Sequence, residues 1–264
     1  MAAITICYPA FMMTTALSNL LGIGGASAIS RALGNNNYDK IKKISTMSLL
    51  LSIILSILYS LIVFVLNKPL LYLLGADNDT IHFAEEYLFW VVIIGSLPSV
   101  VNYSLSHLIR ATGKSQSASI GIAMGGIINI ILDPLFIFVF KLNVTGAAIA
   151  TFISNLLACI YFIVYLIITR KTSILNFSLK NLKWKDKVIF DIISSGLSSF
   201  FLSLMALFSN ASINKLMSSY SASAISGVNI AKKLIFVLLP LLKVLPKVFF
   251  HLLDIILRQK MVNV

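Results

Sequence analysis

Charged side chains are scarce in this sequence of 264 residues, because only 11% of them are Asp, Glu, Lys or Arg while 58% are hydrophobic. A soluble domain carries about 25% charged and about 45–50% apolar residues. So few charges cannot cover a surface that faces water, which argues against a soluble globular enzyme. The many aliphatic residues and the few charges also argue against a disordered chain.

The chain also lacks the alternation of apolar and polar residues that a transmembrane β-barrel needs over strands of about 10 residues. It contains unbroken apolar runs instead, such as SLLLSIILSILYSLIVFVL. About 20 mostly apolar residues suffice for a helix to cross a bilayer. We therefore expect an all-α polytopic membrane protein with about seven transmembrane helices, near residues 3–30, 45–66, 84–108, 116–140, 144–169, 188–214 and 222–246.

Residues with the spacing of a catalytic or metal site are missing as well. Cys7 and Cys159 each lie in an apolar run and are expected to be buried free thiols. We find no Ser-His-Asp arrangement, HExxH, Walker motif or pair of carboxylates, so we expect no enzyme activity and no cofactor. The excess of basic residues, which gives a formal charge of +12, lacks interleaved aromatic residues and does not indicate a nucleic-acid partner.

The basic residues fall in alternate connections between the expected spans. One set of connections carries twelve of them, namely Arg31, Lys40, Lys42, Lys43, Arg110, Lys114, Arg170, Lys171, Lys180, Lys183, Lys185 and Lys187. The intervening connections carry only Lys68 and Lys141, together with acidic residues at 77, 79, 85 and 86. Because cytoplasmic loops are rich in Lys and Arg, we expect a multi-pass protein of the plasma membrane, a bacterial inner membrane, with the Arg31, Arg110 and Arg170 loops in the cytoplasm.

Asp133 stands out because an ionisable group inside a bilayer is costly, by about 2.5–3.5 kcal/mol on insertion scales. Asn129 precedes it by one helical turn on the same face, and Pro134 follows it and is expected to kink the helix. A carboxylate, an amide oxygen and a carbonyl freed by the proline could hold Na⁺ or a proton. The alternative is a packing role, with Asn129 joining two helices and a protonated Asp133 hydrogen-bonded within the bundle.

Glycine patterns predict close contacts between helices. Gly121 and Gly125 form a GxxxG, and Gly22, Gly24 and Gly25 form a GxGG. No strand precedes the GxGG, so it is not a phosphate or dinucleotide loop. Both patterns are typical of tight packing in membrane helices.

Three stretches resemble the multidrug and toxic compound extrusion (MATE) transporters, over roughly residues 1–236: ALSNLLGIGGASAISRALGNNN, LIRATGKSQSASIGIAMGGIINIILDPLFIF and VTGAAIATFISN. The resemblance implies two six-helix lobes around a central cavity, and export of cationic amphipathic molecules in exchange for H⁺ or Na⁺. By motif it also implies a coupling site made of Asn129, Asp133 and Thr151, with Na⁺ as the one metal to consider.

The resemblance divides the chain into parts. Residues 1–170 are expected to be the first lobe without its first helix, 171–187 a cytoplasmic linker, 188–236 the start of the second lobe, and 237–264 a divergent tail. On this interpretation the chain is a fragment with impaired activity. The alternatives are a non-transporting membrane remnant, or a related lipid-linked-sugar flippase, which should carry more cationic residues in its cavity.

Overall fold

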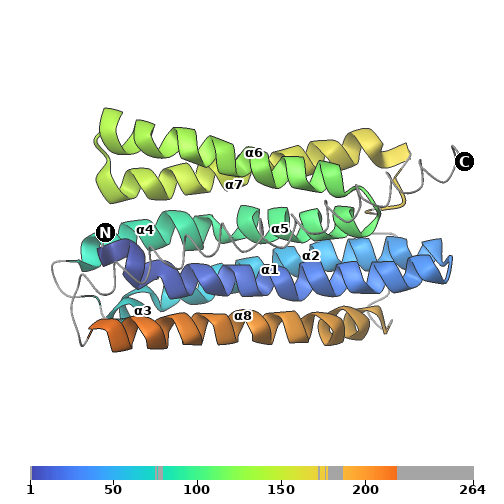
Figure 1. Ribbon diagram of the computed structural model, residues 1–264, viewed down its shortest axis with the longest axis horizontal. Helices are drawn as coiled ribbons and strands as arrows, with labels where there is room; N and C mark the ends of the chain where they lie inside the picture. Colours follow the sequence, from blue (N-terminus) through green and yellow to red (C-terminus); the bar gives the residue numbers. More distant parts are fainter. Residues whose placement is uncertain are drawn as a thin grey trace, which may run out of the picture. The chain divides into compact units, whose positions relative to one another are not determined.

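The computed structural model describes residues 2–74, 76, 80–171, 173–175, 177 and 187–218, and the regular structure in this part of the chain is helical (Figure 1). The α-helices are α1 (Ala2–Gly34), α2 (Tyr38–Val65), α3 (Asn67–Leu73), α4 (Ile81–Leu88), α5 (Ser96–Ala111), α6 (Ser115–Pro134), α7 (Asn143–Ile168) and α8 (Val188–Ser218). Two π-helical segments, η1 (Phe89–Ile94) and η2 (Leu135–Val139), extend α4 and α6, and a 3-10 turn, η3 (Thr169–Lys171), follows α7.

Five of these helices are long and apolar enough to cross a bilayer, and the bent pair formed by α4–η1 and α5 gives a sixth if its two halves are one span. The predicted all-α polytopic membrane fold is therefore confirmed, and six of the expected spans are found. The seventh, near 222–246, lies outside the described residues, as do most of the predicted linker 171–187 and the whole tail 237–264.

The chain separates into two compact units, Met1–Leu207 and Phe208–Val264. In the second unit the structure describes only the end of α8. Within the first unit, α1, α5 and α7 end where α2, α6 and α8 begin, so these six termini share one end of the bundle (Figure 1). We call it the basic end, because it carries Arg31, Lys40, Lys42, Lys43, Arg110, Lys114, Arg170 and Lys187.

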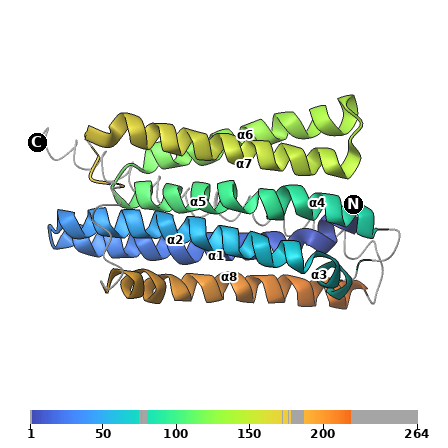
Figure 2. The same cartoon turned by 180° about the vertical axis from the view of Figure 1, so that it is seen from behind.

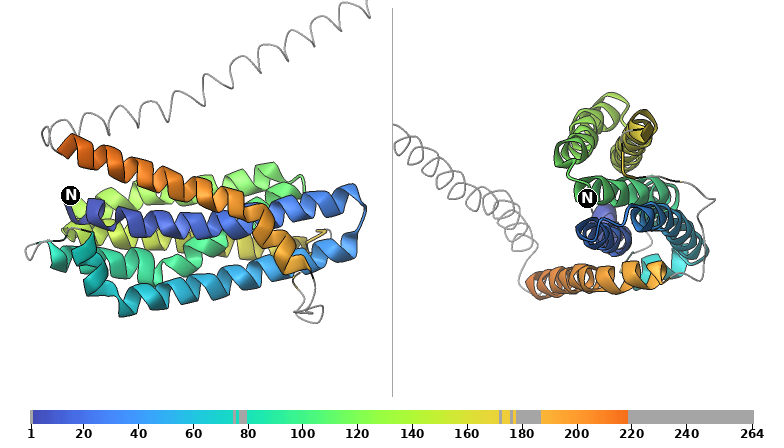
Figure 3. Two further views of the ribbon diagram at one scale, coloured as in Figure 1. Left: turned by 90° about the horizontal axis from the view of Figure 1, so that it is seen from below. Right: turned by 90° about the vertical axis from the view of Figure 1, so that its right-hand side faces the viewer.

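Helix α1 packs against both α2 and α5, while α6 and α7 pair with each other and both touch α5 (Figures 2 and 3). Two buried clusters of apolar side chains fill the bundle. The cluster nearer the basic end contains Leu21, Ile44, Leu108, Phe162 and Ile192, and the other contains Cys7, Val63, Leu71, Val91 and Val92. The two thiols are buried and free, as the sequence predicts.

Small residues let the helices approach closely. A stripe of four serines on α2 is fully buried, namely Ser45, Ser48, Ser52 and Ser56. A side chain added at Gly125 of α6 would lie 3.1 Å from the Cβ of Ala158, and one added at Gly25 of α1 would lie 2.8 Å from Cδ2 of Leu108. The packing role predicted for both glycine patterns is therefore confirmed.

Two expected connections contain more helix than the sequence indicated. Residues 31–43 are helical except for a short turn, in which Asn36 has a φ of +51° and the Asn37 side chain accepts a hydrogen bond from the backbone N–H of Lys40. The expected loop 67–86 contains α3, where Pro69 stands in the first turn. Proline is tolerated there because the N–H groups of a first turn have no partner within the helix.

The span expected as a single helix over 84–108 is broken at Gly95, where its two halves meet at 46°. Pro98 explains part of the break, because it has no N–H to offer the carbonyl four residues earlier. The π-helical residues before Gly95 gain a partner from a neighbouring helix, since the Ser60 hydroxyl donates to the Ile93 carbonyl. A broken helix is tolerated in lipid when a neighbouring side chain replaces a lost backbone hydrogen bond in this way.

Candidate functional site

Asp133 and Asn129 lie on one face of α6 and contact each other. The Asn129 Nδ2 donates to the Asp133 Oδ1 over 3.2 Å, and both side chains are half-buried. Asp133 is the single charged residue in the 25-residue span Ser115–Val139. The predicted pair therefore exists as a hydrogen-bonded unit within a membrane helix.

Pro134 ends α6, and the span continues without interruption as the π-helical η2. At the end of η2 the backbone N–H of Phe140 donates to the Leu135 carbonyl over 3.1 Å, a wider turn than an α-helix makes. Pro134 has no N–H, so the carbonyl of Ile130, one turn before it, loses the partner it would have in a regular helix. The proline thus changes the type of helix next to Asp133, while the span bent by more than 40° is the α4–α5 one.

Thr151 lies on α7, the helix that packs against α6. Its hydroxyl donates to the carbonyl of Ala147 in its own helix over 2.9 Å, and its side chain is half-buried. The structure thus brings Asn129 and Asp133 into direct contact and places Thr151 on the adjacent helix, bonded to its own backbone.

A polar chain that the sequence analysis missed leads to Thr151 from α5. The Asn102 Nδ2 donates to the Asn155 Oδ1 over 3.1 Å, and the Asn155 Nδ2 donates to the Thr151 carbonyl over 2.9 Å. Asn102 is 2% exposed, and its own oxygen has no hydrogen-bond partner among the described residues. The sequence did contain a signal for this chain of contacts, because Asn102 and Asn155 lie inside apolar runs and a polar group in lipid needs a hydrogen-bond partner.

Tyr87 of α4 is a second residue that the sequence analysis missed, because its hydroxyl interacts electrostatically with Asp133. It lies 46 residues before Asp133 in the chain, so no local pattern could join them. The carboxyl group of Asp133 therefore has a hydrogen-bond partner in the Asn129 amide and an electrostatic interaction with Tyr87.

The chemistry open to this group of residues is that of oxygen ligands. Carboxylate, amide and hydroxyl oxygens suit a hard cation or a proton, whereas soft transition metals prefer thiolate and imidazole. Within the described part of the chain, no three His, Cys, Asp or Glu side chains come together as a metal site.

Comparisons with known proteins agree with the helical architecture. The MatE family model matches residues 1–135. The multidrug export protein MepA of Staphylococcus saprophyticus is 33% identical over 235 residues, and MepA of Staphylococcus aureus strain MSSA476 is 32% identical over the same length. These alignments cover 89% of this chain and 51% of each relative, so the chain spans about half the length of the curated relatives it matches.

Solved structures give the same result. An inward-facing multidrug resistance MATE transporter of the MOP superfamily superimposes with a TM-score of 0.79 at 25% identity, over 89% of this chain and 53% of that one. An outward-facing form matches with 0.79 at 25% identity over 89% and 52%, and a MATE in complex with MaD5 matches with 0.80 at 26% identity over 88% and 52%. The chain belongs to the MATE family of multidrug and toxic compound extrusion transporters.

Proposed function

We propose that this chain acts in secondary active multidrug efflux, in which cationic amphipathic molecules leave the cell in exchange for H⁺ or Na⁺. Multidrug transport is what the names of its relatives state, while the coupling ion and the activity of this chain are our proposals. The coupling group is Asp133, held by Asn129, and Thr151 on the adjacent helix is the third residue of the proposed site.

The observation that carries the proposal is the hydrogen bond between Asn129 and Asp133 inside a membrane span. A bare carboxylate in such a position is costly, so a proton or Na⁺ that neutralises it is bound favourably. The ion can drive transport only if it binds one conformation of the protein better than the other. A tenfold difference in affinity corresponds to about 1.4 kcal/mol, which one added ligand or proton can supply.

The basic end of the bundle is the cytoplasmic side in this proposal. Its support is that the described basic residues of alternate connections gather at this end, as the rule for cytoplasmic loops requires. Asp133 then lies toward the far end of α6 from the cytoplasm, because α6 begins at the basic end at Ser115. From there it can exchange its ion with the external medium.

The test uses the 264-residue chain in proteoliposomes with ethidium as the transported cation. A pH gradient and a Na⁺ gradient are imposed in separate experiments, which identifies the coupling ion. We expect dye transport with one of them, and we expect Asp133→Asn to reduce it to the rate of empty liposomes. The substitution keeps the shape of the side chain and removes its charge.

Asp39→Asn serves as the matched control, because Asp39 is an 88% exposed aspartate at the basic end of α2. It should transport like the unmodified chain. Unchanged transport by Asp133→Asn would exclude the carboxylate as the coupling group. If neither gradient moves the dye in the unmodified chain, the proposal that this chain itself transports is wrong.

A further inference from the structure

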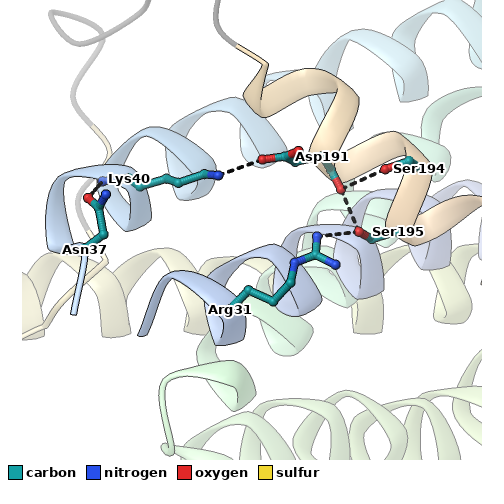
Figure 4. A network of polar contacts seen from close by, with 6 residues as sticks. All are labelled: Arg31, Asn37, Lys40, Asp191, Ser194 and Ser195. Carbon is teal, nitrogen blue, oxygen red and sulfur yellow. Dashed lines mark hydrogen bonds and ion pairs between the residues drawn. The ribbon is translucent and has the colours of Figure 1, made fainter. Parts of the chain in front are cut away.

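A network of polar contacts joins the start of α8 to the turn between α1 and α2 (Figure 4). The Lys40 Nζ lies 2.8 Å from the Asp191 Oδ2, and the Arg31 Nη2 donates to the Ser195 Oγ over 2.6 Å. The Ser195 hydroxyl in turn donates to the Asp191 carbonyl over 2.7 Å. These contacts join residues separated by 151 and 164 positions in the sequence.

The two residues of the ion pair, Lys40 and Asp191, each lie at the start of a helix. Lys40 stands in the first turn of α2, and its backbone N–H donates to the Asn37 side chain over 2.9 Å. This cap fixes the direction in which α2 starts. Asp191 likewise lies in the first turn of α8, where a carboxylate is favoured by the helix dipole. Each charge of the ion pair therefore stands in the first turn of its own helix.

Below the network, α1 and α8 touch through glycine. A side chain added at Gly24 would lie 3.0 Å from the Cα of Gly196, so the two backbones are almost in contact. Further from the basic end, the Asn19 Nδ2 donates to the Ser203 Oγ over 3.0 Å. The contact between α1 and α8 thus runs from the basic end toward the middle of the bundle.

Water reaches the ion pair. The Lys40 and Asp191 side chains are 43% and 31% exposed, and cavities of about 380 and 430 Å³ open beside them. Half-exposed ion pairs are weak and are screened by salt. The ion pair between Lys40 and Asp191 therefore adds little to stability, but a weak contact suits two helices that must separate and come together again.

We propose that Arg31, Lys40, Asp191 and Ser195 form a latch that closes α8 against α1 and α2 at the basic end. Releasing the latch lets the start of α8 move away from α1, and its closure seals that end of the protein. Its use in transport rests on the function proposed above, in which the basic end faces the cytoplasm and must alternately open and shut.

Spin labels measure the movement directly. Asn36→Cys in the α1–α2 turn and Ser198→Cys on α8 are both at exposed positions, and Cys7→Ser with Cys159→Ala removes the natural thiols. In nanodiscs, the distance distribution of the labelled chain should be dominated by one short population. Lys40→Asp places two carboxylates together and should raise the ratio of the long to the short population up to about fivefold, as the loss of a partly exposed ion pair allows.

Two comparisons separate the latch from a general effect of charge. The exchange Lys40→Asp with Asp191→Lys restores the attraction, so its ratio should lie nearer to that of the unmodified pair than to either single variant. Lys42→Asp is the matched control, because Lys42 pairs with Asp39 within α2 and bridges no two helices. It should leave the ratio unchanged.

The latch proposal is wrong if Lys40→Asp leaves the distances unchanged or if the exchange does not restore them. It is also wrong if Lys42→Asp changes the distances as much as Lys40→Asp does. Should Lys40→Asp fail to fold, Lys40→Gln removes the same attraction more mildly and should shift the ratio in the same direction. The labels report on α8 without any transport. A chain with a working latch and no dye efflux would therefore contradict the proposed function alone.

Discussion

Replacing Gly121 by alanine should destabilise the pairing of α6 with α7. The added Cβ would lie 2.7 Å from Cε1 of Phe162 and 2.8 Å from Cδ1 of Tyr161. Phe162 is fully buried, so its ring has little room to turn away. Overpacking of this kind costs about 1–3 kcal/mol. Alanine recovers about 0.5–1 kcal/mol over glycine in a helix, so the middle of these ranges leaves a net loss of about 1 kcal/mol.

The same helix supplies a graded set of controls. At Gly126 an added Cβ meets nothing within 4 Å, so Gly126→Ala should keep the gain in helix propensity and raise stability slightly. At Gly125 the nearest atom is the Cβ of Ala158 at 3.1 Å, and Gly125→Ala should fall between the other two. The order of stability should therefore follow the space at each position.

The buried thiols make the measurement possible. Cys7 and Cys159 are 0% and 7% exposed, so a maleimide dye that fluoresces on reaction reports unfolding in detergent. With roughly 2–4 °C for each kcal/mol in a chain of this size, Gly121→Ala should lower the apparent Tm by about 2–4 °C. Equal Tm values for Gly121→Ala and Gly126→Ala would refute the reasoning that this glycine exists for close packing.

Two more predictions concern contacts between other helices. In a double-mutant cycle of Asn102→Ala and Asn155→Ala, read by the same thermal assay, the coupling energy should be about 0.6 kcal/mol and at most about 1.7 kcal/mol, as for other hydrogen bonds between membrane helices; strictly additive losses would show that the two amides do not interact. Gly95→Ala should lower the apparent Tm, because the added Cβ would lie 2.7 Å from the Trp90 carbonyl oxygen and backbone cannot move aside as a flexible side chain does; an unchanged Tm would mean that the break at Gly95 does not need glycine.

Features that depend on neighbours along one helix were predictable. The apolar runs located the six described spans to within four residues, except that α2 begins at Tyr38, seven residues before the expected start. They could do so because the length needed to cross a bilayer is fixed by the rise of a helix. The contact between Asn129 and Asp133 followed from their spacing of four, which puts two side chains one above the other. The basic residues were expected at one end because an even number of spans separates the connections that carry them.

Contacts between helices were not predictable to the same degree. In lipid, helices associate through close packing and polar contacts more than through an apolar stripe, so the sequence carries little periodic signal of which faces meet. Asn102 and Asn155, or Lys40 and Asp191, come together only when the rotation and depth of separate helices are set.

The sequence by itself thus determined that this chain is a set of membrane helices with one charged group in the last turn of α6, because both properties follow from local spacing. Tertiary structure decided what that group and the basic end can do. It supplied the hydrogen bond between Asn102 and Asn155 and the contact between α8 and α1, since each of these depends on side chains brought together from distant parts of the chain.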